Sequence, residues 1–242
     1  MKVGVFDSGV GGLTVLKELV NKYPNNHYIY YGDTKNIPYG DKSLDELKLL
    51  VDNIMNFMIT KNVDIVVIAC GTVSSNLTEY IKSTYKIPII DIISPTINYI
   101  NNSSYEKIGV IATNSTINSK VFSKRINKDV KEVSCKSFVP LIESNNLSNL
   151  GYYLDLYLKD LKDRDIVILG CTHYPIIEKY IRKYLGNNID VLNMASLVPN
   201  VFKNDSLKVV DLYFSLLDDK TKLNVKSIID FKINSLNEIK KP

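Results

Sequence analysis

Short apolar segments rich in Val and Ile alternate along the chain with longer segments in which apolar residues recur every three or four positions. The first pattern indicates buried strands and the second indicates amphipathic helices, so their alternation predicts a mostly parallel sheet covered by helices. We therefore expect the α/β class. The predicted strands are Lys2–Phe6, His27–Tyr31, Asp64–Ala69, Pro88–Ile92, Lys107–Ala112, Lys131–Cys135, Asp165–Gly170 and Ile189–Leu192, with a further candidate at Lys208–Phe214.

The helical pattern is clearest from Ser43 to about Thr60. Apolar residues there follow at steps of three or four, at Leu44, Leu47, Leu50, Val51, Ile54, Phe57 and Met58. Ser43 and Glu46 have the spacing of a capping box, which satisfies free backbone N–H groups at a helix start. This segment is expected to be a structural helix.

Two sequence segments recur in the second part of the chain. Asp64–Cys70 (DIVVIAC) matches Asp165–Cys171 (DIVILGC), and Lys2–Val5 (KVGV) matches Lys107–Val110 (KIGV). Such repetition predicts two pseudo-symmetric α/β domains, the first formed by residues 1–92 together with 196–242 and the second by residues 93–195.

The repeat also predicts where a ligand binds. Open α/β sheets bind ligands beyond the carboxyl ends of their strands. Cys70, Cys171 and the Asp7-Ser8 turn all follow predicted strands. We therefore expect an active site in a cleft between the two domains, with one thiol contributed by each.

Composition and charge exclude several classes of protein. The 30 Lys and Arg residues exceed the 26 Asp and Glu residues only slightly and are scattered, which indicates no nucleic-acid partner. No stretch approaches the roughly 18 apolar residues of a membrane span, and Asp7 interrupts any signal-peptide core. We expect a cytoplasmic protein without a membrane partner, whose three cysteines serve metal binding, catalysis or packing rather than disulfides.

Cys70 and Cys171 each end an apolar strand and precede a Thr and a helix, where backbone N–H groups favour a thiolate. A single cysteine in such a place is commonly a packing residue, but two at matched positions favour function. Inverting an amino-acid α-carbon requires one group to remove a proton on one face and another to donate one on the opposite face. One thiol from each domain suits that reaction.

Nothing in the sequence singles out a lysine for a pyridoxal Schiff base, so no cofactor is expected. A cofactor-free site must stabilise the developing carbanion with fixed donors, for which the hydroxyls and backbone amides around Ser8, Thr72 and Thr172 are available.

Two further residues could assist the thiols. His173 follows Cys171 closely and could polarise it or shuttle its proton, or it could merely cap the helix that begins near Pro175. Asp7 could hold a substrate ammonium or assist Cys70. His27 lies on a predicted strand and is interpreted as structural.

Dinucleotide binding and metal binding fit less well. The glycines after Asp7, with Asp33 further on, resemble a dinucleotide fingerprint, but its third glycine falls on Thr14 and Asp7 would repel a pyrophosphate. The chain has no Cys-x-x-Cys pair, and Cys135 lies in a predicted strand, which indicates packing and no metal site.

Three motifs, in this order, resemble the aspartate/glutamate racemase superfamily, and within it the glutamate racemases. They are Phe6–Thr14 (FDSGVGGLT), Tyr31–Asp33 followed by Pro38–Gly40, and Gly170–Pro175 (GCTHYP). The resemblance implies interconversion of L- and D-glutamate without cofactor, supplying D-glutamate for peptidoglycan, by a homodimer.

The resemblance also implies roles for particular residues. Cys70 would act as base toward one enantiomer and Cys171 toward the other, with Glu143 as an assisting carboxylate. The residues expected to contact or support the substrate are Asp7, Ser8, Tyr39, Gly40, Gly71, Thr72, Thr113, Thr116, Thr172 and His173.

The main departure from the family pattern is Gly71, where relatives usually carry an Asn that binds substrate. A lost hydrogen bond to a charged group costs roughly 1.5–3 kcal/mol. Aspartate or another amino acid therefore stays open as the substrate, as does a non-catalytic relative that binds an acidic amino acid.

Overall fold

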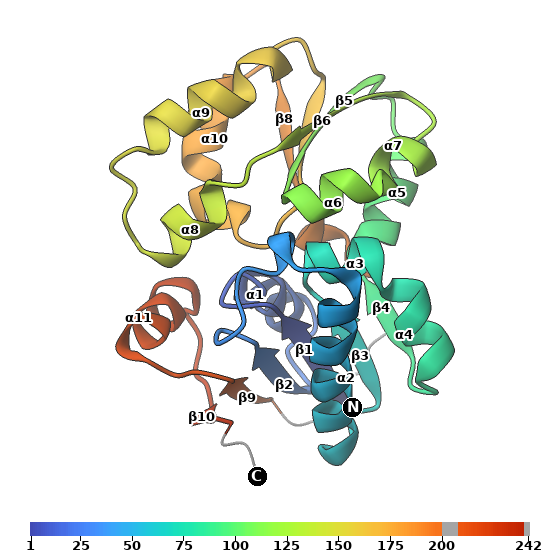
Figure 1. The fold of residues 1–242 in the computed structure, drawn as a ribbon, viewed down its shortest axis with the longest axis vertical. Helices are drawn as coiled ribbons and strands as arrows, with labels where there is room; N and C mark the ends of the chain where they lie inside the picture. The colour runs from blue at the N-terminus through green and yellow to red at the C-terminus, as the bar shows by residue number, and fades with distance from the viewer. Residues whose placement is uncertain (200–207, 240–242) are drawn as a thin grey trace.

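The computed structural model describes residues 1–199 and 208–239, which form two parallel sheets (Figure 1). The six-stranded sheet has the order β10-β9-β2-β1-β3-β4, and all its pairs are parallel. Its strands are β1 (Lys2–Asp7), β2 (His27–Gly32), β3 (Ile65–Ile68), β4 (Ile89–Asp91), β9 (Val209–Phe214) and β10 (Ser235–Glu238).

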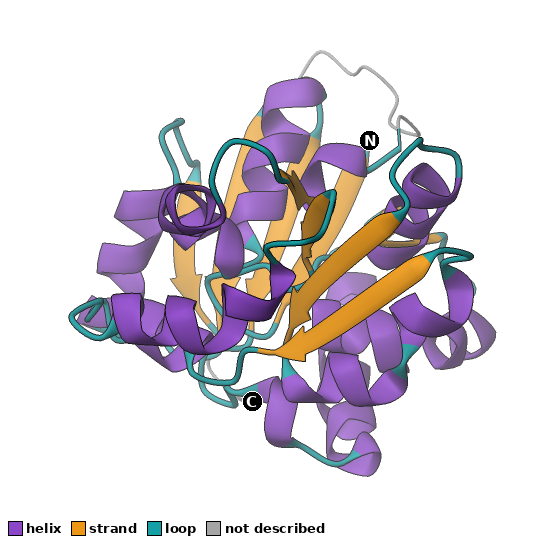
Figure 2. Ribbon diagram, turned by 90° about the horizontal axis from the view of Figure 1, so that it is seen from above, coloured by secondary structure: helices purple, strands orange, loops and turns teal. Residues whose placement is uncertain are grey.

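The second sheet has four strands in the order β6-β5-β7-β8, again all parallel. Its strands are β5 (Lys107–Ala112), β6 (Asp129–Ser134), β7 (Ile166–Leu169) and β8 (Asp190–Asn193). Helices lie on both sides of the sheets (Figure 2), so the predicted α/β class is confirmed.

One strand was missed, and the bounds of another were predicted wrongly. Strand β10 was not predicted, because its sequence, SLNE, has no apolar run and it lies at the edge of its sheet. The strand predicted at Lys131–Cys135 is β6, which spans Asp129–Ser134, so Cys135 follows the strand instead of belonging to it. The reason is its alternating half-buried pattern on an edge strand, which gives only a weak apolar signal.

The predicted helix from Ser43 is α2 (Leu44–Thr60), and both hydrogen bonds of its capping box are present. Its buried face includes Leu47, Val51 and Ile54, whereas Leu44 is exposed. The other α-helices are α1 (Leu13–Lys22), α3 (Gly71–Asn76), α4 (Thr78–Thr84), α5 (Ile93–Asn101), α6 (Asn114–Ser119), α7 (Val121–Arg125), α8 (Phe138–Glu143), α9 (Leu150–Leu158), α10 (Glu178–Leu185) and α11 (Asp219–Ile228). Short 3₁₀ helices are η1 (Tyr39–Asp41), η2 (Lys159–Leu161), η3 (Tyr174–Ile177) and η4 (Met194–Leu197).

A continuous apolar core joins the two halves. One cluster of buried residues contains Val3 and Val5 of β1 together with Val110 of β5 and Ile168 of β7. Burial of such aliphatic side chains stabilises a fold by about 1.5–3 kcal/mol each. The shared core therefore holds the ends of β1, β3, β5 and β7 in a defined relation to one another.

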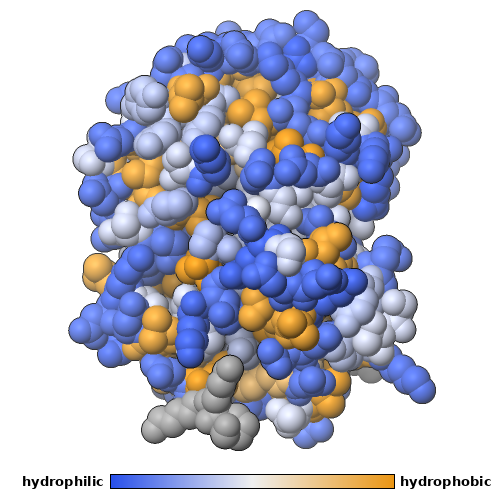
Figure 3. Space-filling view, viewed as in Figure 1, coloured by the Kyte–Doolittle hydropathy of each residue, from blue (hydrophilic) through white to orange (hydrophobic). Residues whose placement is uncertain are grey.

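The C-terminal strands β9 and β10 extend the sheet of the N-terminal half, beside β2. Residues 200–207 and 240–242 of the predicted return to the first domain lie outside the described residues. On the face shown in Figure 3, apolar residues surface only in separate small groups among hydrophilic ones. Within the described ranges, no helix has the length and apolar character needed to cross a membrane.

Candidate active site

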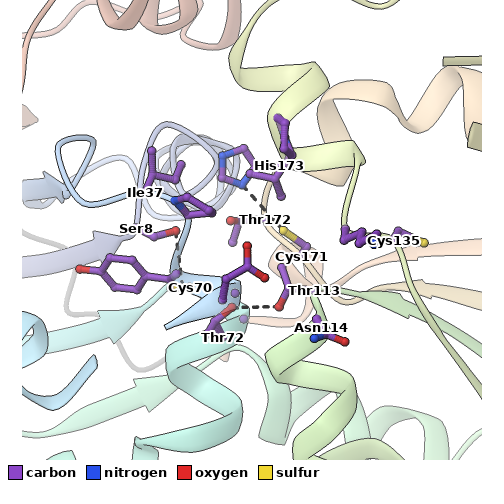
Figure 4. A pocket seen from close by; sticks show the side chains of 18 residues that line it. Ser8, Ile37, Cys70, Thr72, Thr113, Asn114, Cys135, Cys171, Thr172 and His173 are labelled. Atoms are coloured by element: carbon purple, nitrogen blue, oxygen red, sulfur yellow. Dashed lines mark hydrogen bonds between the residues drawn. The ribbon is translucent and has the colours of Figure 1, made fainter. Parts of the chain in front are cut away.

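A cavity lies where the two halves meet, and Figure 4 shows the side chains around it. Loops that follow β1, β2 and β3 line it from the N-terminal half, and loops that follow β5, β6 and β7 line it from the other half. Cys70 and Cys171 lie on opposite sides of it (Figure 4). This cavity is the meeting point of the strand ends that the repeat predicts.

Cys70 is buried between the end of β3 and the start of α3, with its sulfur 3.8 Å from the Ser8 hydroxyl oxygen. Burial raises the pKa of the Cys70 thiol, the negative charge of Asp7 raises it further, and the backbone N–H of Val73 opposes both only in part. The helix start lowers the pKa of Cys70 as expected, but burial and the charge of Asp7 outweigh it. The pKa of the Cys70 thiol therefore lies above that of a free cysteine, which favours the protonated form.

Asp7 lies beneath the cavity, fully buried, and is not among the residues that line it. Its carboxylate accepts hydrogen bonds from the backbone N–H groups of Gly9 (3.1 Å) and Gly12 (2.9 Å) and from the Thr172 hydroxyl (3.2 Å). A Cβ on Gly12 would lie 2.4 Å from the Asp7 Cβ, so this turn requires glycine. Asp7 thus ties the first loop to the strand end that carries Cys171.

Asp33, the acid that a dinucleotide site would use, is also buried. Its carboxylate accepts hydrogen bonds from the Tyr39 hydroxyl (2.5 Å) and the Asn36 side-chain amide (2.9 and 3.0 Å). These contacts leave Asp33 holding the loop that places Tyr39 and Gly40 on the cavity wall. The Tyr39 hydroxyl therefore donates to Asp33 and not to a group in the cavity.

Cys171 has a different set of partners. The Nδ1 atom of His173 lies 3.7 Å from the Cys171 sulfur, and its Nε2 atom lies 2.7 Å from a carboxylate oxygen of Glu143. Burial by itself lowers the pKa of His173, but its hydrogen bonds with Cys171 and Glu143 outweigh burial and raise the pKa well above its usual value. His173 makes no capping hydrogen bond with its side chain, so the helix-cap interpretation is wrong.

Glu143 is the other member of this pair, and it lies behind His173 and does not line the cavity. Burial raises the pKa of its carboxyl, but the hydrogen bond and charge of His173 outweigh burial and lower it. The Glu143 carboxylate therefore contacts the protonated His173 imidazole, which in turn contacts the Cys171 sulfur.

Three threonine hydroxyls connect the halves beside the thiols. The Thr72 and Thr113 hydroxyl oxygens lie 3.0 Å apart, and the Thr113 and Thr116 hydroxyl oxygens lie 3.1 Å apart. Thr72, Thr113 and Thr172 line the cavity, whereas Thr116 is fully buried behind Thr113. Thr116 is placed to support Thr113 and not to touch a ligand directly.

Gly71 lines the cavity where the two halves face each other, opposite Gly170. A Cβ on Gly71 would lie 2.5 Å from the backbone carbonyl oxygen of Gly170, a distance that real Cβ atoms essentially never show. A side chain at position 71 would therefore require the backbone at Gly170 to shift. The hydrogen bond to substrate that Asn makes in relatives must therefore come from other residues.

Several residues border the cavity that were not among the predicted site residues. They are Ile37, Pro38, Asp41, Asn114, Cys135, Lys136, Val139 and Pro140. Cys135 and Lys136 follow β6, so the rule that ligands bind beyond strand ends could have identified them had the strand been ended correctly. The Cys135 sulfur lies 3.8 Å from the Val133 carbonyl oxygen, and Cys135 is fully buried, in agreement with its interpretation as a packing residue.

The described residues contain no group of three or more His, Cys, Asp or Glu side chains arranged to hold a metal ion. The groups available for chemistry at the cavity are the thiols of Cys70 and Cys171, a third thiol at Cys135, the His173–Glu143 pair and a set of hydroxyls.

Comparison with known proteins agrees with this geometry. Residues 8–196 match the family described as Asp/Glu/Hydantoin racemase. The chain is 37% identical to a glutamate racemase of Hydrogenobaculum sp., over 96% of this chain and 94% of the relative. The structure of the glutamate racemase of Aquifex pyrophilus superposes with a TM-score of 0.83 at 35% identity, covering 97% of this chain and 98% of that one.

A glutamate racemase isoform from Bacillus anthracis has the same fold, with a TM-score of 0.89 at 26% identity over 97% of this chain and 96% of the other. These matches confirm the resemblance inferred from the three motifs, including the assignment to the racemase class of isomerases. In sequence and in fold, this chain belongs to the Asp/Glu/Hydantoin racemase family.

Proposed function

We propose that the protein is a cofactor-independent glutamate racemase in which Cys70 and Cys171 move protons on opposite faces of the α-carbon. The observation that carries the proposal is the pair of thiols, one from each half, on opposite sides of one cavity. The glutamate racemase of Francisella tularensis, solved in complex with D-glutamate, supports glutamate as substrate, because it is 31% identical over 99% of this chain and 97% of its own.

The reaction transfers one proton in each of two steps. One cysteine, as the thiolate, takes the α-proton, and the electron pair of the broken C–H bond stays on the α-carbon and spreads into the carboxyl group. The other cysteine, as the thiol, then donates its proton to the opposite face. The two thiols end with exchanged protonation states, so the reverse reaction uses each in the other role.

The neighbours of the two thiols divide the proton handling between them. The raised pKa of Cys70 makes it the proton donor when the reaction begins from the resting site. Protonated His173, held by Glu143, can donate a hydrogen bond to the Cys171 sulfur and so stabilise its thiolate. The direction in which Cys171 is the base and Cys70 is the proton donor therefore has both of its proton-transfer groups in place.

The developing carbanion needs donors whose positions are set beforehand, since such donors stabilise charge without reorganising. The hydroxyls of Ser8, Thr72, Thr113 and Thr172 surround the space between the thiols. Asp7 and Thr116 fix two of them by hydrogen bonds from behind. We assign these residues to binding and orienting the amino acid.

The same family membership supports a role for the product, D-glutamate, in peptidoglycan synthesis. It also supports action in the cytoplasm as a homodimer, with a small-molecule substrate and no nucleic-acid partner. These parts of the proposal rest on the family resemblance and on the even charge of the chain.

The direct test is proton NMR of the purified protein in D2O with L-glutamate and, separately, with D-glutamate, without added cofactor. We expect the α-proton signal to disappear and chiral analysis to find the opposite enantiomer. Exchange with neither enantiomer, in folded protein with reduced thiols, would contradict the proposal. Aspartate is then the next substrate, and binding without exchange would identify a non-catalytic acidic-amino-acid-binding relative.

A further inference from the structure

Thr14 takes the place of the third glycine of a dinucleotide fingerprint, and no step of the proposed reaction uses it. It is the second residue of α1, it is half-buried, and it is not among the residues that line the cavity. Its hydroxyl oxygen lies 3.0 Å from the Thr172 carbonyl oxygen and 2.9 Å from that of Gly11. A side chain of the first half therefore reaches, from outside the cavity, the segment that follows Cys171.

The Thr172 carbonyl oxygen needs a donor from outside its own segment. In a 3₁₀ turn, such as the one that begins here, a carbonyl accepts from the N–H three residues further on. For Thr172 that residue is Pro175, which has no N–H. The N–H of Ile176 donates instead to the His173 carbonyl oxygen, at 3.1 Å. Because Thr172 is buried and an unpaired buried carbonyl is costly, the Thr14 hydroxyl supplies what Pro175 cannot.

The turn against which His173 packs depends on the same hydroxyl. A Cβ on Gly11 would lie 2.7 Å from the Cε1 atom of His173, closer than real Cβ atoms come, so the imidazole ring rests directly on the backbone of this turn. The single proton of the Thr14 hydroxyl is shared between the Gly11 and Thr172 carbonyl oxygens. Thr14 thereby connects the turn beside the ring to the peptide that carries the ring.

The orientation of that peptide matters because it sets two side chains at once. It directs the His173 ring, whose nitrogens lie 3.7 Å from the Cys171 sulfur and 2.7 Å from the Glu143 carboxylate. It also directs the Thr172 hydroxyl, which donates to Asp7 at 3.2 Å and lines the cavity. Displacing a group near the reacting atoms by about 1 Å can cost a large factor in rate. A hydroxyl that holds this peptide in place therefore affects turnover without touching the substrate.

We propose that Thr14 is a positioning residue for the Cys171 side of the reaction. Its hydroxyl holds the peptide between Thr172 and His173 against the first half, and so keeps the His173 ring in contact with the Cys171 sulfur. This inference rests on the proposed racemase function. Cys70 makes its side-chain contact within the first half, so its side of the reaction should not depend on this hydroxyl.

The first test observes His173 directly and needs no turnover. The chain has two histidines, so NMR of histidine-labelled protein gives two ring signals to titrate, those of His173 and His27. Contacts with Cys171 and Glu143 raise the pKa of His173. Thr14→Ala should therefore shift the titration midpoint of His173 downward, and Thr14→Ser, which keeps the hydroxyl, should restore the wild-type midpoint.

His27 is an internal control, because its carboxylate partner lies away from the cavity, and its titration should be the same in every variant. Thr96→Ala is the matched control variant. The fully buried Thr96 hydroxyl also donates to a backbone carbonyl oxygen, at 2.8 Å, but away from the cavity. Its loss should leave the His173 titration unchanged. Thr14→Val, which keeps the side-chain volume, is a second hydroxyl-free variant with the same expected shift as Thr14→Ala.

Turnover assays then show which thiol is affected. Thr14→Ala should lower kcat and kcat/KM for both glutamate enantiomers by about ten-fold, because the lost contact orients a group that acts in the transition state. With α-deuterated substrates, the primary isotope effect should rise for the enantiomer whose α-proton Cys171 removes and fall for the other, since transfer at Cys171 becomes rate-limiting. That enantiomer is the one exchanged by Cys70→Ser. A loss of stability alone would leave both isotope effects unchanged.

An unchanged His173 titration in the hydroxyl-free variants would overturn the proposal. The same shift in Thr96→Ala, or isotope effects that change equally for both enantiomers, would also overturn it. Failure of the racemase proposal has a different signature. In that case the wild-type protein exchanges no α-proton of glutamate, whereas the His173 titration still shifts in Thr14→Ala and returns in Thr14→Ser.

Discussion

The two cysteines occupy equivalent positions in the repeat but have different surroundings. Cys70 directly precedes α3 and contacts Ser8 across its own half, above the buried Asp7. Cys171 is followed by Thr172 and His173 before η3 begins, and the histidine joins it to Glu143. Burial and a nearby carboxylate favour the protonated form of one thiol, and a charged pair supports proton transfer at the other.

The comparison shows that the two repeats share backbone positions. The groups that control proton transfer come from segments that do not repeat. Strand β1 ends in the turn of Asp7 and Ser8, whereas its counterpart β5 ends in Thr113, which contacts Thr72 across the cavity. A racemase needs two opposed groups but not two identical environments, because each thiol plays acid in one direction and base in the other.

Replacing either thiol should have the largest effect on racemisation. Cys70→Ser and Cys171→Ser should each lower racemisation by about a thousand-fold, since a serine hydroxyl is a poor acid and base at neutral pH. In each variant the surviving thiol should still exchange the α-proton of one enantiomer, and the favoured enantiomer should be opposite in the two variants. Proton NMR in D2O with each enantiomer measures both effects.

Cys135→Ala is the matched control for these variants, because Cys135 is the third buried cysteine and its sulfur faces the Val133 carbonyl oxygen. It should keep racemisation within a few-fold of the wild type. Unimpaired turnover in both serine variants, or loss of the same enantiomer in both, would remove the two-thiol mechanism.

The charged pair on the Cys171 side should show the next largest effect. Glu143→Gln removes the carboxylate that raises the pKa of His173, and it should lower racemisation by about a hundred-fold. Asp211→Asn is its control, because Asp211 makes the other close histidine contact, with His27 at 2.7 Å, away from the cavity. An equal loss in both variants would mean that the Glu143 effect is not specific to the site.

The same pair predicts a pH dependence of stability. The raised pKa of His173 stabilises the fold fully below about pH 6.5, and this contribution is lost as the pH rises through the folded value. The lowered pKa of Glu143 contributes above about pH 4.3 and is lost as the pH falls. Thermal unfolding of the wild type should therefore show the pair's contribution between these limits, and Glu143→Gln should flatten the decline above about pH 6.5.

A smaller effect is expected where the two halves touch. Gly71→Ala places a Cβ 2.5 Å from the Gly170 carbonyl oxygen, and relieving that overlap should cost about 1–3 kcal/mol of folding free energy. Gly151→Ala in α9 is the matched control, because a Cβ there meets no atom within 4 Å. The control should gain up to about 1 kcal/mol. Thermal unfolding measures both, and a Gly71→Ala protein as stable as the control would show that the halves can part without cost.

The local pattern of the chain determined the class of the fold and the positions of the chemistry. Apolar runs such as Asp64–Ala69 and Asp165–Gly170 predicted β3 and β7, because a strand covered on both faces must be apolar throughout. The positions of Cys70 and Cys171 just beyond them followed from chain order. The spacing of Ser43 and Glu46 likewise predicted the start of α2.

Only the tertiary structure decided how these residues meet. Packing between distant segments brings Gly71 against Gly170 and places Asp7 beneath the cavity. It also adds polar β10 to a sheet edge and puts Lys136 on the cavity wall. The raised pKa of Cys70 has the same origin, since it depends first on burial. Local periodicity records which face of an element is buried, but the neighbours that desolvate or charge a side chain are set by packing between elements.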